Sequence, residues 1–470
     1  MKGFVPTPVS IVDLMVTKLF KEKIPQKDDN LLDPGCGTGA FIDGIIRWCT
    51  LHSQELPNII GIESDPRHIP EARRKFQDYP SIEIRNEDFL TNIHGKFDYI
   101  IGNPPYVSIT KLTEIEKNQY RKLFQTASGR FDLYMLFFEQ GLRCLEKEGR
   151  LVFITPEKYL YVQTARKLRF LLGRFFLKEI HLLPEQTFGD LTTYPTITTV
   201  LNVPPKEPTD LMFRDGSLRH LMLPREGSSF LPSMNGTSDK KPGYYELRDV
   251  CIRVSCGVAT GADSVFIKPS REIDPCLAQF AFPTIAGRQL SIDSPLLHSE
   301  DSIIVPYSRD GKILPEKKLG CLGDYLSHFG NYNKLLKRTC VSRKPWYAFH
   351  ENPPLNHILR PKIICKDITI RPYFWIDHTG EFVPRHSVYY IVPKNEEDLE
   401  SLCTYLNSEE ARSWLEGHCQ RAANGFIRLQ SNVLKHLPIP RSAFEHSNKR
   451  SENHESGIQN ENPLMAIVKV

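Results

Sequence analysis

The sequence predicts an α/β protein, in which a doubly wound, mainly parallel sheet is followed by a second domain of mixed α+β structure. Two observations favour this fold class. Over residues 1–205, short apolar segments rich in β-branched residues alternate with stretches whose apolar residues recur at helical spacing. Over residues 244–442 that alternation is lost, and aromatic and basic clusters such as residues 344–347 take its place. A chain of 470 residues is long enough for two or three domains.

Each element of the first domain has its own signal. The helices are expected where apolar residues recur every three or four positions, and the strands where a short apolar run stops at Gly, Pro or a polar residue. Helices are expected at residues 11–20, 42–48, 131–145 (followed by Gly149) and 165–176. Strands are expected at residues 31–33, 59–63, 82–84, 97–102, 151–154, 179–183 and 196–203.

The composition also suggests domain boundaries. Residues 206–243 are rich in Pro and then in Ser, Asn, Gly and Lys, which predicts a linker or long loop. Residues 244–442 are expected to form the second domain. Residues 443–470 are polar and poor in apolar groups, and we expect this tail to be disordered.

The net charge and the cysteine content indicate which partners and which cellular compartment to expect. The net charge is +4, divided as +1 in residues 1–205 and +3 in the remainder, which is too small to prove a nucleic-acid partner. Eleven cysteines without a C-x-x-C pair predict a cytoplasmic protein with packed thiols and no metal site. No secretory signal pattern and no apolar run of about 18 residues is found, so no membrane association is expected.

The most informative stretch is residues 97–107. An apolar strand ends at Gly102 and is followed at once by Asn103, Pro104, Pro105 and Tyr106. Ligands of open α/β sheets bind beyond the carboxyl ends of the strands, so these residues are expected at the rim of an active site. The two prolines fix their own φ angles and stiffen the loop.

This loop suits a planar substrate that carries an amino group. The Asn103 side-chain oxygen and the Pro104 main-chain oxygen can each accept one amino hydrogen, and Tyr106 can stack on the ring. The alternative is an ordinary turn, since Asn-Pro is common in turns. Residues 352–355 repeat Asn-Pro-Pro after a polar stretch and with Leu in place of Tyr, and we interpret that copy as a plain turn.

Further candidate ligand contacts lie at the ends of the other strands. Asp33 precedes glycines at 35, 37 and 39, a turn that lets backbone approach a ligand and that also fits a dinucleotide fingerprint loosely. A carboxylate there can pair with a cationic amino-acid group. Glu63 can bind ribose hydroxyls. The remaining candidates are Asp88 and Phe89, for an adenine, and Thr7, between two prolines, as a pocket-lining residue.

In their order and rough spacing these motifs resemble those of the amino-methylating DNA methyltransferases, in particular the gamma-class N6-adenine enzymes typified by the TaqI methyltransferase. The matching residues are Thr7-Pro8, 33–39, Glu63, Asp88-Phe89 and 103–106. The resemblance is strong over residues 1–205 and looser over 244–440. In the second region, short segments similar to the family are found at 260–267, 287–288, 406–408 and 437–440. Gly35 stands where the family often has Ala.

The resemblance implies a Rossmann-like methyltransferase sheet followed by a target-recognition domain. It implies S-adenosylmethionine as methyl donor, held by Thr7, Asp33, Gly35, Gly37, Glu63, Asp88 and Phe89. Asn103 and Pro104 would hold the target amine, and Tyr106 and Phe188 would enclose an adenine flipped out of duplex DNA. Transfer would be direct, without a metal, and the second domain would read base edges in the major groove.

The resemblance also implies a restriction-modification role. The residues outside the two domains are too few for a nuclease domain, so any cognate endonuclease is expected to be a separate polypeptide. Three alternatives stay open. They are a methyltransferase for RNA adenine or protein glutamine that shares the same loop, a DNA-binding protein without catalysis, and a nicotinamide oxidoreductase.

Overall fold

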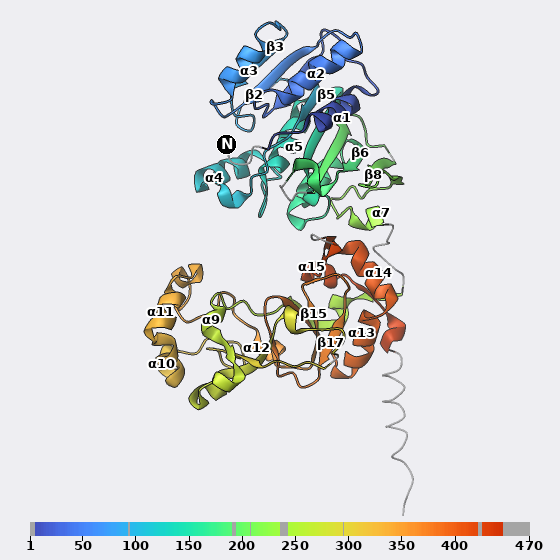
Figure 1. Cartoon of the computed structure of the whole chain (residues 1–470). Coiled ribbons are helices and arrows are strands. Elements are labelled where there is room, and N and C mark those ends of the chain that lie inside the picture. Colours follow the sequence, from blue (N-terminus) through green and yellow to red (C-terminus); the bar gives the residue numbers. More distant parts are fainter. Residues whose placement is uncertain are drawn as a thin grey trace, which may run out of the picture. The chain divides into compact units, whose positions relative to one another are not determined.

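The computed structural model describes residues 5–92, 95–189, 194–206, 208–235, 243–294, 296–421 and 425–444. The chain divides into two compact units, Met1–Gly236 and Thr237–Val470 (Figure 1). Each unit has its own hydrophobic core and is described by itself.

The first unit is built on a nine-stranded sheet with the order β3-β2-β1-β4-β5-β7-β6-β8-β9. The five strands from β3 to β5 are parallel, and β7 is antiparallel to both of its neighbours. The strands are β1 Asn30–Pro34, β2 Asn58–Glu63, β3 Ile82–Asn86, β4 Phe97–Gly102, β5 Leu145–Pro156, β6 Phe176–Leu182, β7 Pro195–Leu201, β8 Thr209–Met212 and β9 Leu218–Leu221.

Helices pack on both faces of this sheet, because the central strands are apolar on both sides. Leu31 and Ile101 belong to one buried cluster together with α1 and α2, whereas Leu32 and Ile100 belong to another together with α5. The helices are α1 Val9–Phe20, α2 Ala40–Leu51, α3 Ile69–Phe76, α4 Glu114–Leu123, α5 Leu133–Cys144, α6 Arg166–Leu172 and α7 Leu231–Asn235. The unit is therefore doubly wound, as the sequence predicts.

Several boundaries in this unit differ from the predictions. Strand β5 begins at Leu145 instead of residue 151, and the helix expected at 165–176 ends at Leu172, since Phe176 already belongs to β6. Residues 206–243 are not simply a linker, because β8 and β9 extend the sheet, with β8 parallel to β6. Short four-residue strands between prolines and glycines gave no alternation long enough to recognise. Of the predicted tail, residues 445–470 lie outside the described residues.

The second unit contains two four-stranded sheets, with the orders β11-β19-β15-β17 and β12-β14-β13-β18, and two smaller ones. The strands are β10 Tyr244–Glu246, β11 Cys251–Cys256, β12 Ile267–Pro269, β13 Ala281–Ile285, β14 Asp301–Ile304, β15 Lys362–Lys366, β16 Ile368–Thr369, β17 Phe374–Asp377, β18 Val383–Pro384, β19 Val388–Pro393, β20 Gln420–Arg421, β21 Ile427–Arg428 and β22 Pro438–Pro440. Strand β10 pairs with β22, so the beginning and the end of the unit are joined.

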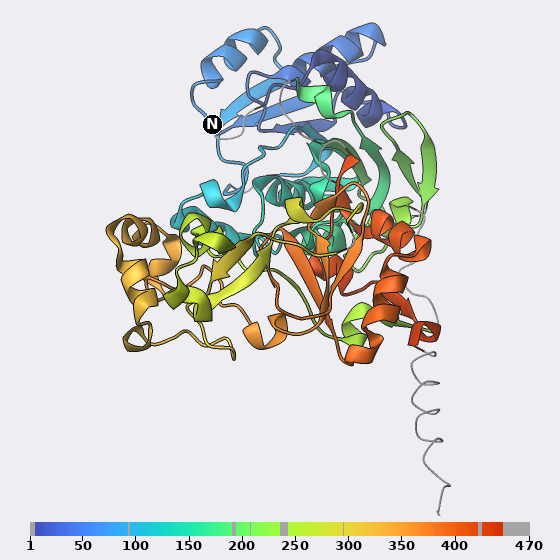
Figure 2. The same ribbon diagram turned by 60° about the horizontal axis from the view of Figure 1, so that its bottom comes forward.

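Short helices surround these sheets, which makes the unit mixed α+β. They are α8 Leu247–Val250, α9 Asp263–Phe266, α10 Cys321–Ser327, α11 Phe329–Leu336, α12 Leu355–Ile358, α13 Leu399–Leu406, α14 Glu409–His418 and α15 Ser431–Leu434. Within the unit, α10 and α11 lie at one end and α13 and α14 at the other, as two views show (Figures 1 and 2). Among the described helices of the chain, none is long and apolar enough to cross a membrane.

Candidate functional site

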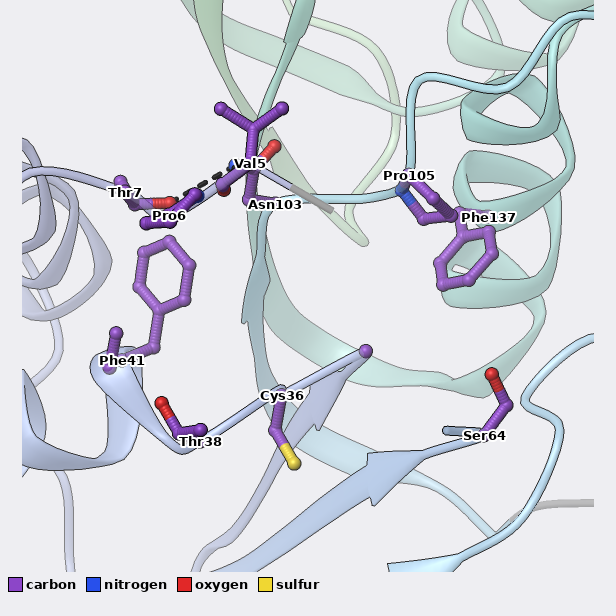
Figure 3. A pocket seen from close by; sticks show the side chains of 12 residues that line it. Val5, Pro6, Thr7, Cys36, Thr38, Phe41, Ser64, Asn103, Pro105 and Phe137 are labelled. Atoms are coloured by element: carbon purple, nitrogen blue, oxygen red, sulfur yellow. Dashed lines mark hydrogen bonds between the residues drawn. The ribbon is translucent and has the colours of Figure 1, made fainter. Parts of the chain in front are cut away.

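The strand order reverses between β1 and β4, which are parallel neighbours in the sheet. From this point the chain proceeds to β2 and β3 on one side and to β5 on the other, and such a reversal opens a crevice at the carboxyl ends of the strands. The glycine turn after β1 and the Asn-Pro-Pro-Tyr loop after β4 both enter it. The pocket between them (Figure 3) is lined by Val5, Pro6, Thr7, Gly35, Cys36, Thr38, Ala40, Phe41, Ser64, Asn103, Pro105 and Phe137.

The glycine turn needs glycine for its backbone shape. Gly35, Gly37 and Gly39 all have φ between +55° and +89°, a region that side chains disfavour. At Gly39 a Cβ atom would also lie 2.3 Å from the Phe76 ring, so no larger residue fits. The amides of residues 35 and 36 donate to the Ile62 carbonyl at 2.7 and 2.9 Å, which ties the turn to the end of β2.

Glu63, at the end of β2, braces the same turn. Its side chain is fully buried, and its oxygens accept hydrogen bonds from the amides of Gly37 (2.9 Å) and Asp65 (2.6 Å). The carboxylate expected to bind ribose therefore already holds the backbone that faces the pocket. Each carboxylate oxygen has two lone pairs, so a contact with a hydroxyl group stays a prediction.

Asp33 is the least satisfied polar group of the site. It lies in β1 with no exposed surface, and neither of its carboxylate oxygens has a hydrogen-bond partner among the described residues. Burial, and secondarily the charge of Glu63, raise its pKa well above the ordinary value. A buried carboxyl group without partners is costly for a fold, and a cationic ligand group would satisfy it.

The side-chain amide of Asn103 uses its nitrogen, but not its oxygen, in hydrogen bonds to described residues. Its Nδ2 donates to the Val5 carbonyl and to Thr7 Oγ1, both at 3.1 Å (Figure 3). Its Oδ1 is buried and accepts no hydrogen bond from any residue that the structure describes. Because the two donated bonds hold the amino group in place, the acceptor oxygen of Asn103 is the atom available to a ligand.

Asn352, in the second Asn-Pro-Pro sequence, is an internal comparison. Its Oδ1 accepts hydrogen bonds from Tyr307 at 3.3 Å and from Lys344 at 3.1 Å, and its side chain is exposed. The loop leads into the short helix α12 rather than following a strand. The same tripeptide therefore leaves a free buried acceptor in one place and none in the other.

Pro104 supplies a second acceptor beside Asn103. No described residue donates a hydrogen bond to its main-chain oxygen, whereas the Pro105 oxygen next to it accepts from the Val107 amide at 3.1 Å. Two consecutive prolines leave no amide donors in this part of the loop. The loop thus offers two oxygen acceptors in sequence and no competing donor.

Tyr106 and Phe188 lie together, as the sequence predicts. Phe188 ends a single 3-10 turn, Glu185–Phe188, that follows β6. Their ring centroids are 6.4 Å apart and the rings are nearly perpendicular, at 85°. Tyr106 donates a hydrogen bond to the Ile154 carbonyl at 3.4 Å, and burial raises the pKa of its phenol, so the hydroxyl is neutral. Asp190, two residues further along the chain, lies outside the described residues.

Asp88 and Phe89 follow β3 and differ in their exposure. Asp88 is half-buried and accepts a hydrogen bond from the Leu90 amide at 2.9 Å. The Phe89 side chain is buried in the core and packs on Phe137 at 5.3 Å, so it does not line the pocket. Phe89 was the residue expected to cover a ligand ring, whereas the ring that lines the pocket here is that of Phe137.

Six pocket residues lie outside the motifs recognised in the sequence, namely Val5, Pro6, Ala40, Phe41, Ser64 and Phe137. Phe41 and Ser64 had a usable signal, since each lies within two residues of a recognised motif. Phe137 had none, because it occupies one position of a dense apolar helix whose other residues form the core. In Figure 3 the Phe41 and Phe137 rings stand on opposite sides of the pocket.

This arrangement is suited to two ligands. One side has an unpartnered carboxylate and a glycine turn, which fit a molecule with a cationic amino-acid end. The other side has two oxygen acceptors and two aromatic rings, which fit a planar group with an amino substituent. Among the described residues no group of three or more His, Cys, Asp or Glu side chains is placed to hold a metal ion.

Comparison with known families agrees with this division into two units. Residues 49–188 match the family model described as Eco57I restriction-modification methylase. Residues 320–439 match the one described as TaqI-like C-terminal specificity domain.

Individual relatives cover most of the chain. The type II methyltransferase M.PaeR7I of Pseudomonas aeruginosa is 26% identical over 79% of this chain and 70% of its own length. The type II methyltransferase M.BstVI of Geobacillus stearothermophilus is 25% identical over 100% of this chain and 95% of its own length. Among solved structures, the type IIL restriction-modification enzyme MmeI in complex with DNA aligns with a TM-score of 0.61 and 13% identity, over 90% of this chain and 65% of that chain. At that identity the match shows the fold alone.

The state of Asp33 predicts an unusual effect on stability. Its folded-state pKa lies above the unfolded value of about 3.9. Asp33 therefore does not lower the free energy of unfolding below that pH, and it lowers this free energy increasingly as the pH rises toward the folded-state pKa. Asp33→Asn should therefore raise the thermal unfolding midpoint of the ligand-free protein at pH 7.5, and the gain should shrink as the pH falls toward 4.

The matched control is Asp98→Asn on the neighbouring strand, because Asp98 accepts a hydrogen bond from the Asn30 amide at 3.0 Å. That substitution should not stabilise the protein. Equal midpoint shifts for the two variants at every pH would contradict the assignment of Asp33 as a strained group.

Proposed function

We propose, for a chain with an Eco57I restriction-modification methylase domain and a TaqI-like C-terminal specificity domain, that it is a DNA methyltransferase specific for adenine. It transfers a methyl group from S-adenosylmethionine to the N6 amino group of an adenine in duplex DNA. The observation that carries this proposal is the buried, unused Oδ1 of Asn103, fixed in a pocket that it shares with the glycine turn.

The residues of the β1 side fit S-adenosylmethionine. The two unpartnered oxygens of Asp33 match the ammonium group of its methionine part, and the backbone of Gly35 and Gly37 allows close approach. Glu63 is the candidate for the ribose hydroxyls. When bound, the cofactor supplies a methyl group on a sulfonium ion.

The adenine of the cofactor has candidate contacts on the other wall. Asp88 is half-buried and can accept from its exocyclic amino group. Phe137 lines the pocket, and its ring can cover the purine, supported from behind by Phe89 at 5.3 Å. Asp88 was predicted from the sequence, whereas Phe137 replaces Phe89 in the covering role.

The loop after β4 acts on the target amine. Asn103 Oδ1 and the Pro104 oxygen each accept one hydrogen of the amino group. An aryl amine is a poor nucleophile because its lone pair is delocalised into the ring, and two acceptors that hold its hydrogens favour a pyramidal nitrogen whose lone pair is free. The methyl group then passes directly to nitrogen, and most of the rate enhancement comes from positioning.

An adenine inside a duplex cannot reach this loop, so the proposal includes base flipping. Tyr106 and Phe188 are the candidates that receive the flipped base. A base between two rings requires roughly parallel planes, whereas these rings stand at 85°. One ring therefore has to turn when the base enters, and Phe188, on its single 3-10 turn, is the more mobile candidate.

The specificity domain favours DNA over RNA or protein as the substrate. The matched specificity domain and the names of the methyltransferase relatives support a role in a restriction-modification system, with the cognate endonuclease as a separate polypeptide. The second candidate is methylation at N4 of cytosine, because the same two acceptors suit any aryl amine.

The substrate is tested with radiolabelled S-adenosylmethionine. The purified chain is incubated in separate reactions with duplex DNA, RNA and protein, and the nucleic acids are digested to nucleosides. We expect label in N6-methyladenine from duplex DNA. Label in N4-methylcytosine would correct the base, and transfer only to RNA or protein would overturn the proposal.

Removing the Asn103 side chain should separate catalysis from cofactor binding. Asn103→Ala eliminates one of two acceptors for the amine, so kcat should fall by about 10²–10³ or more. Cofactor affinity, measured by calorimetry, should change little because Asp33 and the glycine turn remain. Loss of both together would mean that Asn103 has a structural role instead.

Thr7 should act as a positioning residue. Its Oγ1 accepts one of the two hydrogen bonds from Asn103 Nδ2, so Thr7→Val should let the amide reorient and lower kcat by roughly tenfold, the equivalent of about 1.4 kcal/mol. Thr7→Ser keeps the acceptor and should restore kcat. If Ser and Val behaved alike, the methyl group of Thr7 rather than its hydroxyl would be the important part.

A further inference from the structure

Helices α10 and α11 form a hairpin at one end of the second unit (Figures 1 and 2). The hairpin is firmly anchored by four leucines buried in the core of the unit, Leu319, Leu322, Leu326 and Leu335. Tyr325 on α10 also donates a hydrogen bond to the Val265 carbonyl at 2.7 Å, and Asn331 on α11 donates to the Tyr325 carbonyl at 2.9 Å. The outer surface of α11 therefore has a fixed orientation within the unit.

That outer surface is apolar, although it faces solvent. Phe329, Tyr332 and Leu336 are 80%, 37% and 43% exposed. They are spaced by three and four positions and so form one stripe, on a different side of α11 from the buried Leu335. The Tyr332 ring packs edge-to-face on Trp346 at 4.9 Å, which supports the stripe from one side. Exposed aromatic stripes of this kind commonly mark a contact surface.

The segment that contains the hairpin is strongly basic, although its two helices carry only one Asp and one Lys. Between residues 312 and 344 there are eight Lys or Arg and two Asp or Glu, an excess of six in a chain whose total is only +4. Five of these cations have no ion pair or side-chain hydrogen bond with any described residue, and all five are exposed. They are Lys317, Lys318, Lys334, Lys337 and Arg343.

One lysine lies next to the apolar stripe. At 100° per residue, Lys337, the C-cap of α11, lies about 80° from Phe329 around the helix axis, whereas Lys334 lies about 140° from it, on the side away from the stripe. The neighbouring Arg338 is different, because it turns inward and donates to the carbonyls of Thr260 (2.9 Å) and Ala348 (2.7 Å). Arg338 thus stabilises the fold, while the five unpaired cations remain available to a polyanion.

We propose that this surface, the α11 face (Phe329, Tyr332, Leu336 and Lys337), binds the backbone of duplex DNA. The proposal rests on the proposed function and adds the place where the second unit contacts the DNA backbone. Lys337 neutralises a phosphate, and the Phe329 ring packs against sugars or base edges in a groove. An unpaired cation beside an exposed aromatic ring fits a polyanion that also carries flat apolar surface.

Contacts of this kind are independent of sequence. Each phosphate contact releases counterions, so the logarithm of the binding constant should fall with the logarithm of salt concentration by about 0.9 per contact. The α11 face therefore contributes affinity and register, and the reading of bases belongs to other residues. Removing the charge of Lys337 should weaken binding to all sequences by similar factors.

The test measures the salt dependence of binding to a short fluorescent duplex of mixed sequence, together with methyl transfer to genomic DNA, for the full chain. Lys337→Gln should lower the salt slope by roughly one and weaken binding several-fold at low salt. Phe329→Ala should weaken binding without changing the slope. Because these side chains are exposed, the unfolding midpoint should not move, and it is recorded for every variant.

The chain offers matched controls in the first unit. Lys27 and Lys147 are exposed, have no ion pair among the described residues, and lie near the amino ends of β1 and β5, away from the pocket edge of the sheet. Lys27→Gln/Lys147→Gln should leave the salt slope unchanged. Leu51, 81% exposed at the end of α2, is the control for Phe329, and Leu51→Ala should not affect DNA binding.

The outcomes separate the two proposals. If the wild-type chain methylates DNA and the α11 variants keep its slope and affinity, the α11 face is not a DNA surface and the proposed function stands. If Phe329→Ala dissociates a dimer and leaves DNA binding intact, the face is an interface between copies, which also overturns the inference. If the wild-type chain neither binds nor methylates DNA, the proposed function itself fails.

Discussion

The two hydrogen bonds that Asn103 Nδ2 donates, to Val5 and to Thr7 Oγ1, fix which atom of the amide faces the pocket. An amide can turn over at little cost when its surroundings are symmetrical, and it would then present donors instead of an acceptor. Here both acceptors for Nδ2 come from the segment before α1, which is far from Asn103 in the sequence. The identity of a short N-terminal segment therefore determines the chemistry of a loop almost a hundred residues later.

The end of β1 and the pocket beside it contain polar groups that the fold does not satisfy. Both oxygens of Asp33 and the Oδ1 of Asn103 are buried without partners among the described residues, and such groups cost about 1–3 kcal/mol each. Glu63 keeps the glycine turn in place despite these unsatisfied groups, because each of its carboxylate oxygens accepts a hydrogen bond from a backbone amide. Rigid elements around unsatisfied groups are what a preorganised binding site requires.

The sequence predicted the doubly wound sheet and the loop at its reversal point, because both depend on local signals. Asn103, Asp33 and Gly37 could be found from strand ends, prolines and glycines alone. Phe137 could not, because its core helix is apolar at nearly every position and no local feature distinguishes a pocket-lining ring from a packed one. Likewise, the burial of Phe89 depends on a neighbour 48 positions away, and β8 and β9 depend on an edge of the sheet that only the folded chain creates.

The second unit illustrates why net charge is a poor guide to a nucleic-acid partner. The +4 of the whole chain conceals a segment with an excess of six, because the other residues are slightly acidic in sum. What decides whether a cation can bind phosphate is not the count but whether it already has a partner. Arg338 is committed to main-chain carbonyls, while Lys334 and Lys337, on the same helix or its end, are not. Phosphate contacts carry no sequence information, so base recognition belongs to side chains elsewhere in the unit. Those side chains could change in evolution, and with them the recognised sequence, without loss of the affinity that the phosphate contacts provide.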